Sequence, residues 1–335
     1  MTRTLALVEN SSQLLSLLEW ALGEHDSAPH PERCEAAVLL PRDPATRHQL
    51  GAMARLARAE GIGVGLYDIR RVPVGFPRAP AALVAKLAGA ERLVIGDPSS
   101  RLIRRLLPLA RTRDFVLIDD GTATLDLSRS LLAGRPPVRW HRKRPGSAAA
   151  SRVARRIAPE GGGHLEVFSC LTAGLELPPG SVTSANTYGW ARQRFGPPQV
   201  HPGVDLIGSP LPENGLIDFA RYIRGVVSLA DRVNAERYFA DLREDRDKLR
   251  LIADYAELEV VQPELPLELQ LLKGPVARTL ISLSPTVHTL PLVLAGTGVE
   301  VTVHPEVAGW LHPGRSERSA ASLGAATHKR PGTKT

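Results

Sequence analysis

Apolar runs of strand length recur along the N-terminal half of the chain and mostly lack alternation with polar residues. Strands that are buried on both faces of a parallel sheet have this pattern. It predicts strands at Leu5–Val8, Ala36–Leu40, Val64–Ile69, Leu93–Ile95 and Phe115–Ile118. Apolar residues at helical spacing predict the helices between them, at Gln13–Leu22, Pro44–Glu60, Pro80–Ala90 and Ser99–Arg111. Repeated strand–helix units of this length indicate right-handed crossovers and a doubly wound sheet.

The same alternation resumes in the C-terminal half. Strands are predicted at Leu165–Cys170, Leu206–Ile207, Tyr238–Phe239, Leu258–Val261, Thr279–Leu283 and Val299–Val303. Helices are predicted at Ile217–Val233, Asp245–Ala256, Leu267–Leu272 and Thr286–Leu294. We therefore expect an α/β protein with two Rossmann-like, doubly wound domains that face a central cleft. Ligands bind such sheets beyond the carboxyl ends of the strands, so polar residues directly after apolar runs are the first candidates for a site.

A basic segment separates the two halves. Residues 128–159 carry nine Lys and Arg and no acid, whereas the whole chain of 335 residues has a net charge of +7. Because this segment is also rich in Pro, Gly, Ser and Ala, we expect a first domain at 1–134, a linker or loop at 135–163 and a second domain at 164–313. Residues 314–335 have almost no large apolar side chains and are expected to form a disordered basic tail.

The basic segment is either a solvated linker or a loop that contacts a polyanion. An anionic membrane, contacted through residues 129–156, or an acidic glycan would suit the second interpretation. Nucleic acid is a poorer fit because Trp140 is the one aromatic residue available for base stacking there.

Composition excludes several other classes. Two cysteines are too few for a disulfide framework or a four-ligand zinc site, and no histidine has a second ligand at metal-binding spacing. No run of 18 apolar residues is present and the first apolar run is too short for a secretory signal. These features predict a cytoplasmic protein without a zinc site, and we expect no cofactor.

An acidic pair, Asp119 and Asp120, follows the predicted strand Phe115–Ile118 directly. Two carboxylates held close together raise one pKa, which suits a general base. Gly121 allows a turn there, and Thr122 or Thr124 can cap the next helix. The alternative is a strand-to-helix turn that uses an aspartate as a cap.

A hydroxyl-rich motif follows the predicted strand that begins at Thr279. Ser282 and Ser284 precede Pro285 and Thr286, and a serine before a proline marks a helix start. The amide groups and hydroxyls of such a turn can bind a phosphate, although helix capping explains the same residues almost as well.

Two strand-end turns in the N-terminal half have the same two interpretations. The polar residues after the first strand line the expected cleft or cap a helix: Asn10, Ser11, Ser12 and Gln13. The turn Gly96–Ser100 follows the fourth strand, where capping by Ser99 is the favoured interpretation.

Several blocks together resemble the bacterial sialyltransferases that include the lipooligosaccharide sialyltransferases and the polysialyltransferases. The blocks occur in the family's order between about residue 5 and residue 300: Leu5–Leu15, Leu93–Asp97, Val116–Thr124, Asn186–Tyr188, Leu206–Gly215, Pro263–Glu268 and Ile281–Thr286. Each block is weak by itself, and their order and spacing make the resemblance fairly specific.

The resemblance implies a GT-B fold and an inverting, metal-independent transfer of sialic acid from a CMP-activated donor to a bacterial surface glycan such as a capsule polysaccharide. It also implies that the acidic pair supplies the general base. We favour Asp119 as that base, with Asp120 in support and Gly121 and Thr122 lining the cleft. The donor-binding residues implied are Ser282, Ser284, Thr286, Asp241, Glu244, Gly208, Ser209 and Pro210.

One block departs from the family's pattern. Where a histidine, often followed by two arginines, is expected, this chain has Asp241 and Leu242 and keeps Arg243 and Glu244. An ionised Asp241 near the leaving phosphate would repel it by a few kcal/mol, roughly, at an effective dielectric constant near 20. Arg243 then carries the phosphate, or the donor is another nucleotide-sugar, or the chain is a catalytically degenerate relative that binds glycan or nucleotide.

Overall fold

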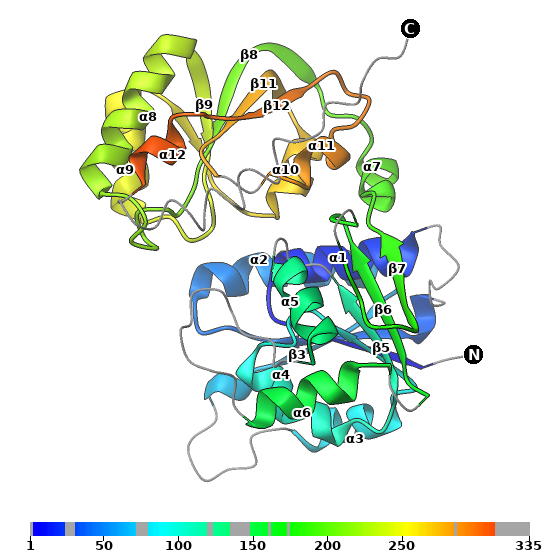
Figure 1. Cartoon of the computed structure of the whole chain (residues 1–335). Coiled ribbons are helices and arrows are strands. Elements are labelled where there is room, and N and C mark those ends of the chain that lie inside the picture. Colours follow the sequence, from blue (N-terminus) through cyan, green and yellow to red (C-terminus); the bar gives the residue numbers. More distant parts are fainter. Residues whose placement is uncertain are drawn as a thin grey trace, which may run out of the picture. The chain divides into compact units, whose positions relative to one another are not determined.

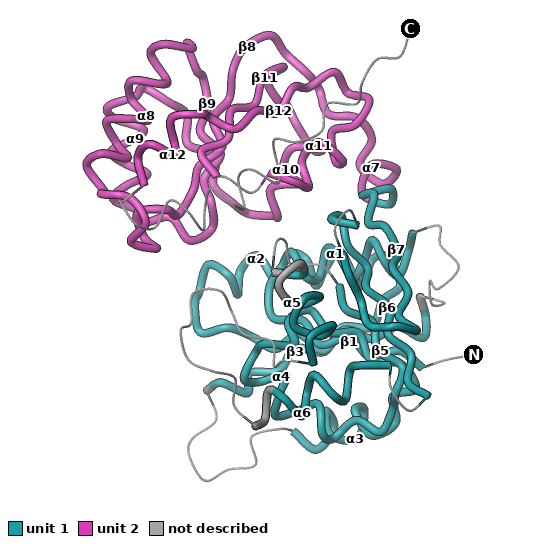
Figure 2. The backbone as a smooth tube through the Cα atoms, in the orientation of Figure 1, with its two compact units in different colours: residues 1–190 teal, residues 191–335 magenta. Residues whose placement is uncertain are grey.

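The computed structural model describes residues 3–23, 31–71, 80–118, 123–134, 148–159, 162–172, 175–284 and 287–311. The chain forms two compact units, Met1–Trp190 and Ala191–Thr335, which are coloured separately in Figure 2. Each unit is described by itself.

A parallel sheet is the centre of the first unit (Figure 1). Its strand order, among the described residues, is β3-β2-β1-β4-β5-β6-β7, and every neighbouring pair is parallel. The strands are β1 (Thr4–Val8), β2 (Cys34–Leu39), β3 (Gly63–Tyr67), β4 (Arg92–Ile95), β5 (Asp114–Ile118), β6 (His164–Ser169) and β7 (Ser181–Ala185). The strand order reverses between β1 and β4, which makes the sheet doubly wound.

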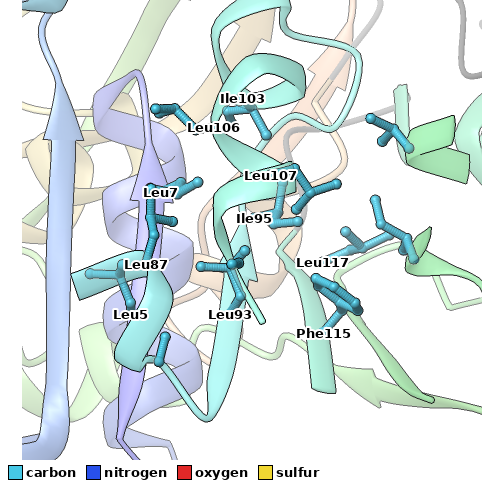
Figure 3. Packing of buried hydrophobic residues seen from close by; sticks show 14 of the residues in the cluster. Leu5, Leu7, Leu87, Leu93, Ile95, Ile103, Leu106, Leu107, Phe115 and Leu117 are labelled. Carbon is cyan, nitrogen blue, oxygen red and sulfur yellow. The ribbon is translucent and has the colours of Figure 1, made fainter. Parts of the chain in front are cut away.

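Helices cover both faces of this sheet. They are α1 (Ser11–Leu22), α2 (Pro44–Ala59), α3 (Ala81–Gly89), α4 (Arg101–Leu106), α5 (Ala123–Leu132) and α6 (Ala148–Ile157), with short 3₁₀ turns at η1 (Pro31–Arg33), η2 (Ile69–Arg71) and η3 (Leu107–Leu109). The helices α1 and α2 pack together, whereas α3, α4, α5 and α6 contribute to one core on the other face. Figure 3 shows part of that core, where Leu93 and Ile95 of β4 lie among side chains from α3, α4 and β5.

The second unit has its own parallel sheet of order β10-β9-β8-β11-β12 among the described residues. The strands are β8 (Val200–Ile207), β9 (Ala235–Phe239), β10 (Glu259–Val261), β11 (Val276–Ser282) and β12 (Glu300–Val303). The helices are α8 (Phe219–Val233), α9 (Arg246–Ala256), α10 (Leu267–Lys273), α11 (Leu290–Val293) and α12 (Val307–Trp310). The boundary between the units falls within α7 (Gly189–Phe195). The predicted α/β class with two doubly wound, Rossmann-like domains is thus confirmed, while the cleft between them stays a prediction.

The domain boundary differs from the one predicted. The strand β6 pairs with β5, β7 pairs with β6, and both belong to the first unit, so the division falls after Trp190 and not at residues 135–163. The strand β7 was not predicted because its sequence, SVTSA, is mostly polar, as suits a largely exposed strand at the edge of the sheet. Within the supposed linker, residues 148–157 form α6, whose side chains Val153, Ala154 and Ile157 are buried.

One predicted helix is shorter than expected. The helix expected over Ser99–Arg111 ends as α4 at Leu106 and continues as the 3₁₀ turn η3, which contains Pro108. A proline inside a helix removes one backbone hydrogen bond, which accounts for the tighter turn.

Candidate functional site

The point where the strand order reverses in the second sheet lies between β8 and β11. The Leu283 amide donates to the Ile207 carbonyl at 2.9 Å, so the carboxyl ends of these strands stay together. Gly208, Ser209 and Pro210 follow β8 at this edge, and Ser284 follows β11. Reversal points of this kind are where doubly wound sheets bind ligands. The second unit therefore brings two of the predicted donor-binding blocks to one edge.

The hydroxyl-rich motif begins with a serine turn. The Ser284 amide donates to the Ser282 hydroxyl at 3.0 Å, and that hydroxyl donates to the Ser284 carbonyl at 3.0 Å. Ser282 is buried and Ser284 is half-buried. Ser282 therefore shapes the turn, while Pro285 and Thr286 lie outside the described residues.

A buried carboxylate, Glu244, holds the end of β9. It accepts hydrogen bonds from the Tyr238 hydroxyl at 2.6 Å and from the Asp241 amide at 2.6 Å. Lys248 Nζ lies 2.8 Å from Glu244 Oε1. Burial raises the pKa of Glu244, whereas Lys248 and the two hydrogen bonds act in the opposite direction. The carboxylate is thus a fixed acceptor that closes the turn after β9.

Lys248 joins this turn to the loop after β8. Its ammonium group is fully buried and donates to the Ser209 carbonyl at 3.1 Å. It also lies 2.8 Å from Glu213 Oε1 and 4.6 Å from the centre of the Tyr222 ring. One lysine therefore bridges two carboxylates and fixes the backbone at Ser209.

Two tyrosines complete this buried network. The hydroxyls of Tyr222 and Tyr238 are 2.8 Å apart, and the Ser209 amide donates to Tyr222 at 3.1 Å. Burial raises the pKa of both phenols well above the ordinary value, so both stay protonated. We use the name strand-end network for Tyr222, Tyr238, Glu244, Lys248 and Glu213.

The sequence analysis named Glu244 as a donor-binding residue, a role that stays a prediction, and it did not single out the other members of the strand-end network. One signal was present, because Lys248 occupies the buried stripe of α9 together with Ile252 and Ala256, at a spacing of four residues. A lysine on such a stripe is seldom fully buried without an acidic partner. The sequence around Tyr222 and Tyr238 did not indicate their role, because the groups to which their hydroxyls bond lie on other helices, strands and loops.

Gly208 lies against the strand-end network. A Cβ built on this residue would stand 2.5 Å from the Tyr238 hydroxyl and closer still to Glu244. The network therefore explains the glycine at this position by packing, independently of any ligand.

Asp241, which replaces the expected histidine, contacts the neighbouring Arg243. Its carboxylate accepts from the Arg243 amide at 2.9 Å and from the Arg243 Nε at 3.2 Å. The Arg243 side chain is 68% exposed and that of Asp241 is 30% exposed. The cation that could hold a phosphate is thus already paired with a carboxylate at the protein surface.

The first sheet has an equivalent edge between β1 and β4, where the predicted cleft residues form a helix cap. Asn10 accepts the Gln13 amide at 2.8 Å, and the Gln13 side chain accepts the Glu9 amide at 2.8 Å. Ser11 bonds to Gln49, whereas Ser12 is exposed.

Packing and capping also account for the turn after β4. A Cβ on Gly96 would collide with the buried Gln13 side chain. Asp97 accepts from the Ser99 amide at 2.8 Å, and Ser100, not Ser99, caps α4.

The predicted base lies outside the described residues. Asp119, Asp120, Gly121 and Thr122 come directly after β5, and Thr124 is buried in α5. Their roles stay predictions.

No group of three His, Cys, Asp or Glu side chains suited to a metal ion occurs in the part of the chain that the structure describes. Within that part, no helix is both long enough and apolar enough to cross a bilayer.

No family model and no curated protein matches this sequence. Among solved structures, the chain is similar to UDP-GlcNAc 2-epimerase from Neisseria meningitidis bound to UDP-GlcNAc, with 10% identity, a TM-score of 0.42 and coverage of 84% of this chain and 77% of that one. It is also similar to MurG from Acinetobacter baumannii, with 10% identity, a TM-score of 0.36 and coverage of 98% and 96%.

Proposed function

We propose that this chain is an inverting, metal-independent glycosyltransferase of the GT-B type. The donor would be a CMP-activated sialic acid or related nonulosonate, and the acceptor a bacterial surface glycan. The observation that carries the proposal is the pairing of two predicted donor-binding blocks, at Gly208–Pro210 and Ser282–Ser284, where the strand order of the second sheet reverses. The enzyme would act in the cytoplasm, with membrane contact as a peripheral protein.

In the proposed reaction the acceptor hydroxyl attacks the anomeric carbon of the donor from the face opposite the nucleotide. Asp119 accepts the hydroxyl proton while the new glycosidic bond forms. The bond from the anomeric carbon to the phosphate oxygen breaks, and CMP leaves with its electron pair. The transition state has oxocarbenium character, so a carboxylate base and fixed dipoles near the leaving phosphate both favour it.

Some residues on the donor side would contact the phosphate, and others would hold those residues in place. Ser284 and Thr286 would contact the phosphate, whereas Ser282 holds the turn on which they lie. The strand-end network would fix the backbone of Ser209 through Lys248. Arg243 would approach the phosphate only if its pairing with Asp241 weakens.

The test is calorimetry with cytidine, uridine and guanosine monophosphates, followed by a transfer assay with CMP-sialic acid and an oligosaccharide acceptor. We expect CMP to bind at least about tenfold more tightly than the others. The variant Asp119→Asn should lower kcat on the order of 100-fold or more while leaving CMP affinity intact. Asp254→Asn, an exposed residue of α9 with the same charge change, is the control. Preference for another nucleotide would contradict the donor, and an active Asp119→Asn variant would contradict the base.

The second candidate is a catalytically degenerate relative that binds glycan or nucleotide without turnover. The ion pair between Asp241 and Arg243 favours it, because the carboxylate neutralises a cation next to the expected phosphate position. CMP binding without transfer by the natural chain, together with transfer by Asp241→His, would support this candidate over the first.

A further inference from the structure

Two stretches of the first unit carry many arginines and no acid. Residues 98–113 contain five arginines, and residues 128–159 contain nine Lys and Arg. The first stretch forms α4 and η3 and ends just before β5, and part of the second forms α6. The helices α4 and α6 lie next to each other on the face of the sheet opposite α1 and α2 (Figure 1).

The contacts between these elements fix which sides reach solvent. Val153, Ala154 and Ile157 of α6 are buried in the same core as Ile103 and Leu106 of α4. The remaining sides of both helices therefore turn outward together.

Arg156 ties α6 to the segment after η3. It donates to the Thr112 carbonyl at 3.3 Å and to the Ala110 carbonyl, and its guanidinium lies 6.0 Å from the centre of the Phe115 ring. Arg156 is thus structural, and it holds Arg111 beside the end of α6.

Besides Arg113 and Arg129, which have other contacts, five described arginines of these two stretches are exposed: Arg101, Arg105, Arg111, Arg152 and Arg155. None of them forms an ion pair or a hydrogen bond with another side chain among the described residues. We call these five residues the arginine face. An exposed cluster of like charges without counter-charges is costly by itself and gains from a polyanionic partner.

Apolar groups lie within the arginine face. Leu109 of η3 is 38% exposed, and the neighbouring Pro108 is exposed as well. No aromatic residue occurs in 98–113 or 148–159, so bases would have nothing to stack on. Cations around a protruding leucine suit a lipid surface, where the arginines meet phosphates and the leucine enters the apolar boundary.

We propose that the arginine face docks the first unit onto an anionic phospholipid membrane, with Leu109 inserted among the lipids. This surface differs from the segment 129–156 expected from the sequence, because α4 supplies Arg101 and Arg105, η3 supplies Leu109, and Arg156 is withdrawn from it. The helix α4 begins just after the carboxyl end of β4, and Arg111 precedes β5 at the opposite edge. The proposal does not depend on the proposed enzymatic activity.

The test is flotation of the full chain with vesicles of phosphatidylcholine alone or with roughly one third phosphatidylglycerol. We expect binding to the anionic vesicles only, and release when NaCl is raised to about 0.5 M. The triple variant Arg101→Gln/Arg105→Gln/Arg111→Gln should lower the partition coefficient on the order of 100-fold, since each basic residue near the surface contributes about fivefold. Leu109→Ser should weaken binding with no change in net charge.

The matched control is Arg221→Gln/Arg246→Gln/Arg278→Gln, which removes three exposed arginines of the second unit. Circular dichroism checks that every variant is folded. The proposal is overturned if the control loses as much binding as the test variant or if wild type binds neutral vesicles equally well. It is also overturned if wild type prefers an acidic polysaccharide or single-stranded nucleic acid to the anionic vesicles.

Discussion

Replacing Gly208 by alanine tests whether packing or a ligand requires the glycine at the end of β8. The backbone φ of Gly208 is not in the left-handed region, so alanine meets no conformational barrier there. The added methyl group would instead stand 2.5 Å from the Tyr238 hydroxyl and 2.6 Å from Tyr238 Cε1, below the 3.0 Å that real Cβ atoms keep. Glu244, on the same side, cannot retreat because Lys248 and the Asp241 amide hold it.

The expected loss of stability combines two contributions. Overpacking a tight site costs roughly 1–3 kcal/mol. Displacing Tyr238 breaks its hydrogen bond to a buried carboxylate, which adds about 1–3 kcal/mol. Alanine also reduces the entropy of the unfolded chain, which returns about 0.4–1 kcal/mol. We therefore expect Gly208→Ala to lower the unfolding free energy of the second unit by about 1–5 kcal/mol.

Urea unfolding followed by circular dichroism measures this change, with CMP calorimetry on the same samples. Gly51→Ala in α2 is the matched control, because its Cβ would meet nothing closer than Arg55 Nη1 at 4.0 Å. Helix propensity predicts that this control gains about 0.5–1 kcal/mol. If Gly208→Ala unfolds at the wild-type urea concentration but loses CMP binding, the glycine serves the ligand and the packing argument is refuted.

Two further predictions concern charges in the second unit. Arg237 donates to buried Asp205 at 3.1 and 2.6 Å, so Arg237→Met should lower the unfolding free energy by roughly 3–5 kcal/mol. Arg250→Met, the control, breaks an exposed pair with Asp247 and should change the unfolding free energy by less than about 0.5 kcal/mol. Equal effects of the two variants in urea unfolding would contradict this prediction. Burial lowers the pKa of His304 from 6.5, so the unfolded chain binds more protons and stability should fall as the pH drops below 6.5 until the folded pKa is passed. His304→Gln should reduce this slope in urea unfolding measured from pH 8 to about pH 5, and an unchanged slope would assign it to other groups.

Many strands and helices could be predicted from the sequence because the central strands of the first sheet are buried on both faces. Strands such as β4 and β5 then consist almost entirely of apolar residues, and the helices between them have one apolar side. Gly208–Pro210, named from the family resemblance, and Ser282–Ser284 lie at one edge of the second sheet, while their role in donor binding stays a prediction.

Features that depend on long-range contacts could not be predicted. The tyrosines of the strand-end network, Tyr222 and Tyr238, look like ordinary core residues until their hydroxyls are found 2.8 Å apart. The helix α6 was not predicted because its three buried residues, Val153, Ala154 and Ile157, are interspersed with three arginines in a basic segment. The ion pair of Asp241 with Arg243 could not be predicted either. The sequence shows only that Asp241 stands where a histidine is expected, whereas the structure shows that this aspartate also pairs with the neighbouring arginine.

The addition of β6 to β5, and of β7 to β6, decides how the first unit could be obtained as a separate fragment. A fragment that stops at residue 163 would leave the amide and carbonyl groups along one side of β5 without partners, in a strand whose residues Phe115–Ile118 are apolar. Such an uncovered strand recruits strands from other molecules, so this fragment should aggregate. A fragment that continues to Trp190 keeps both strands and also the bond from the Trp190 amide to Glu19, which secures its last residue.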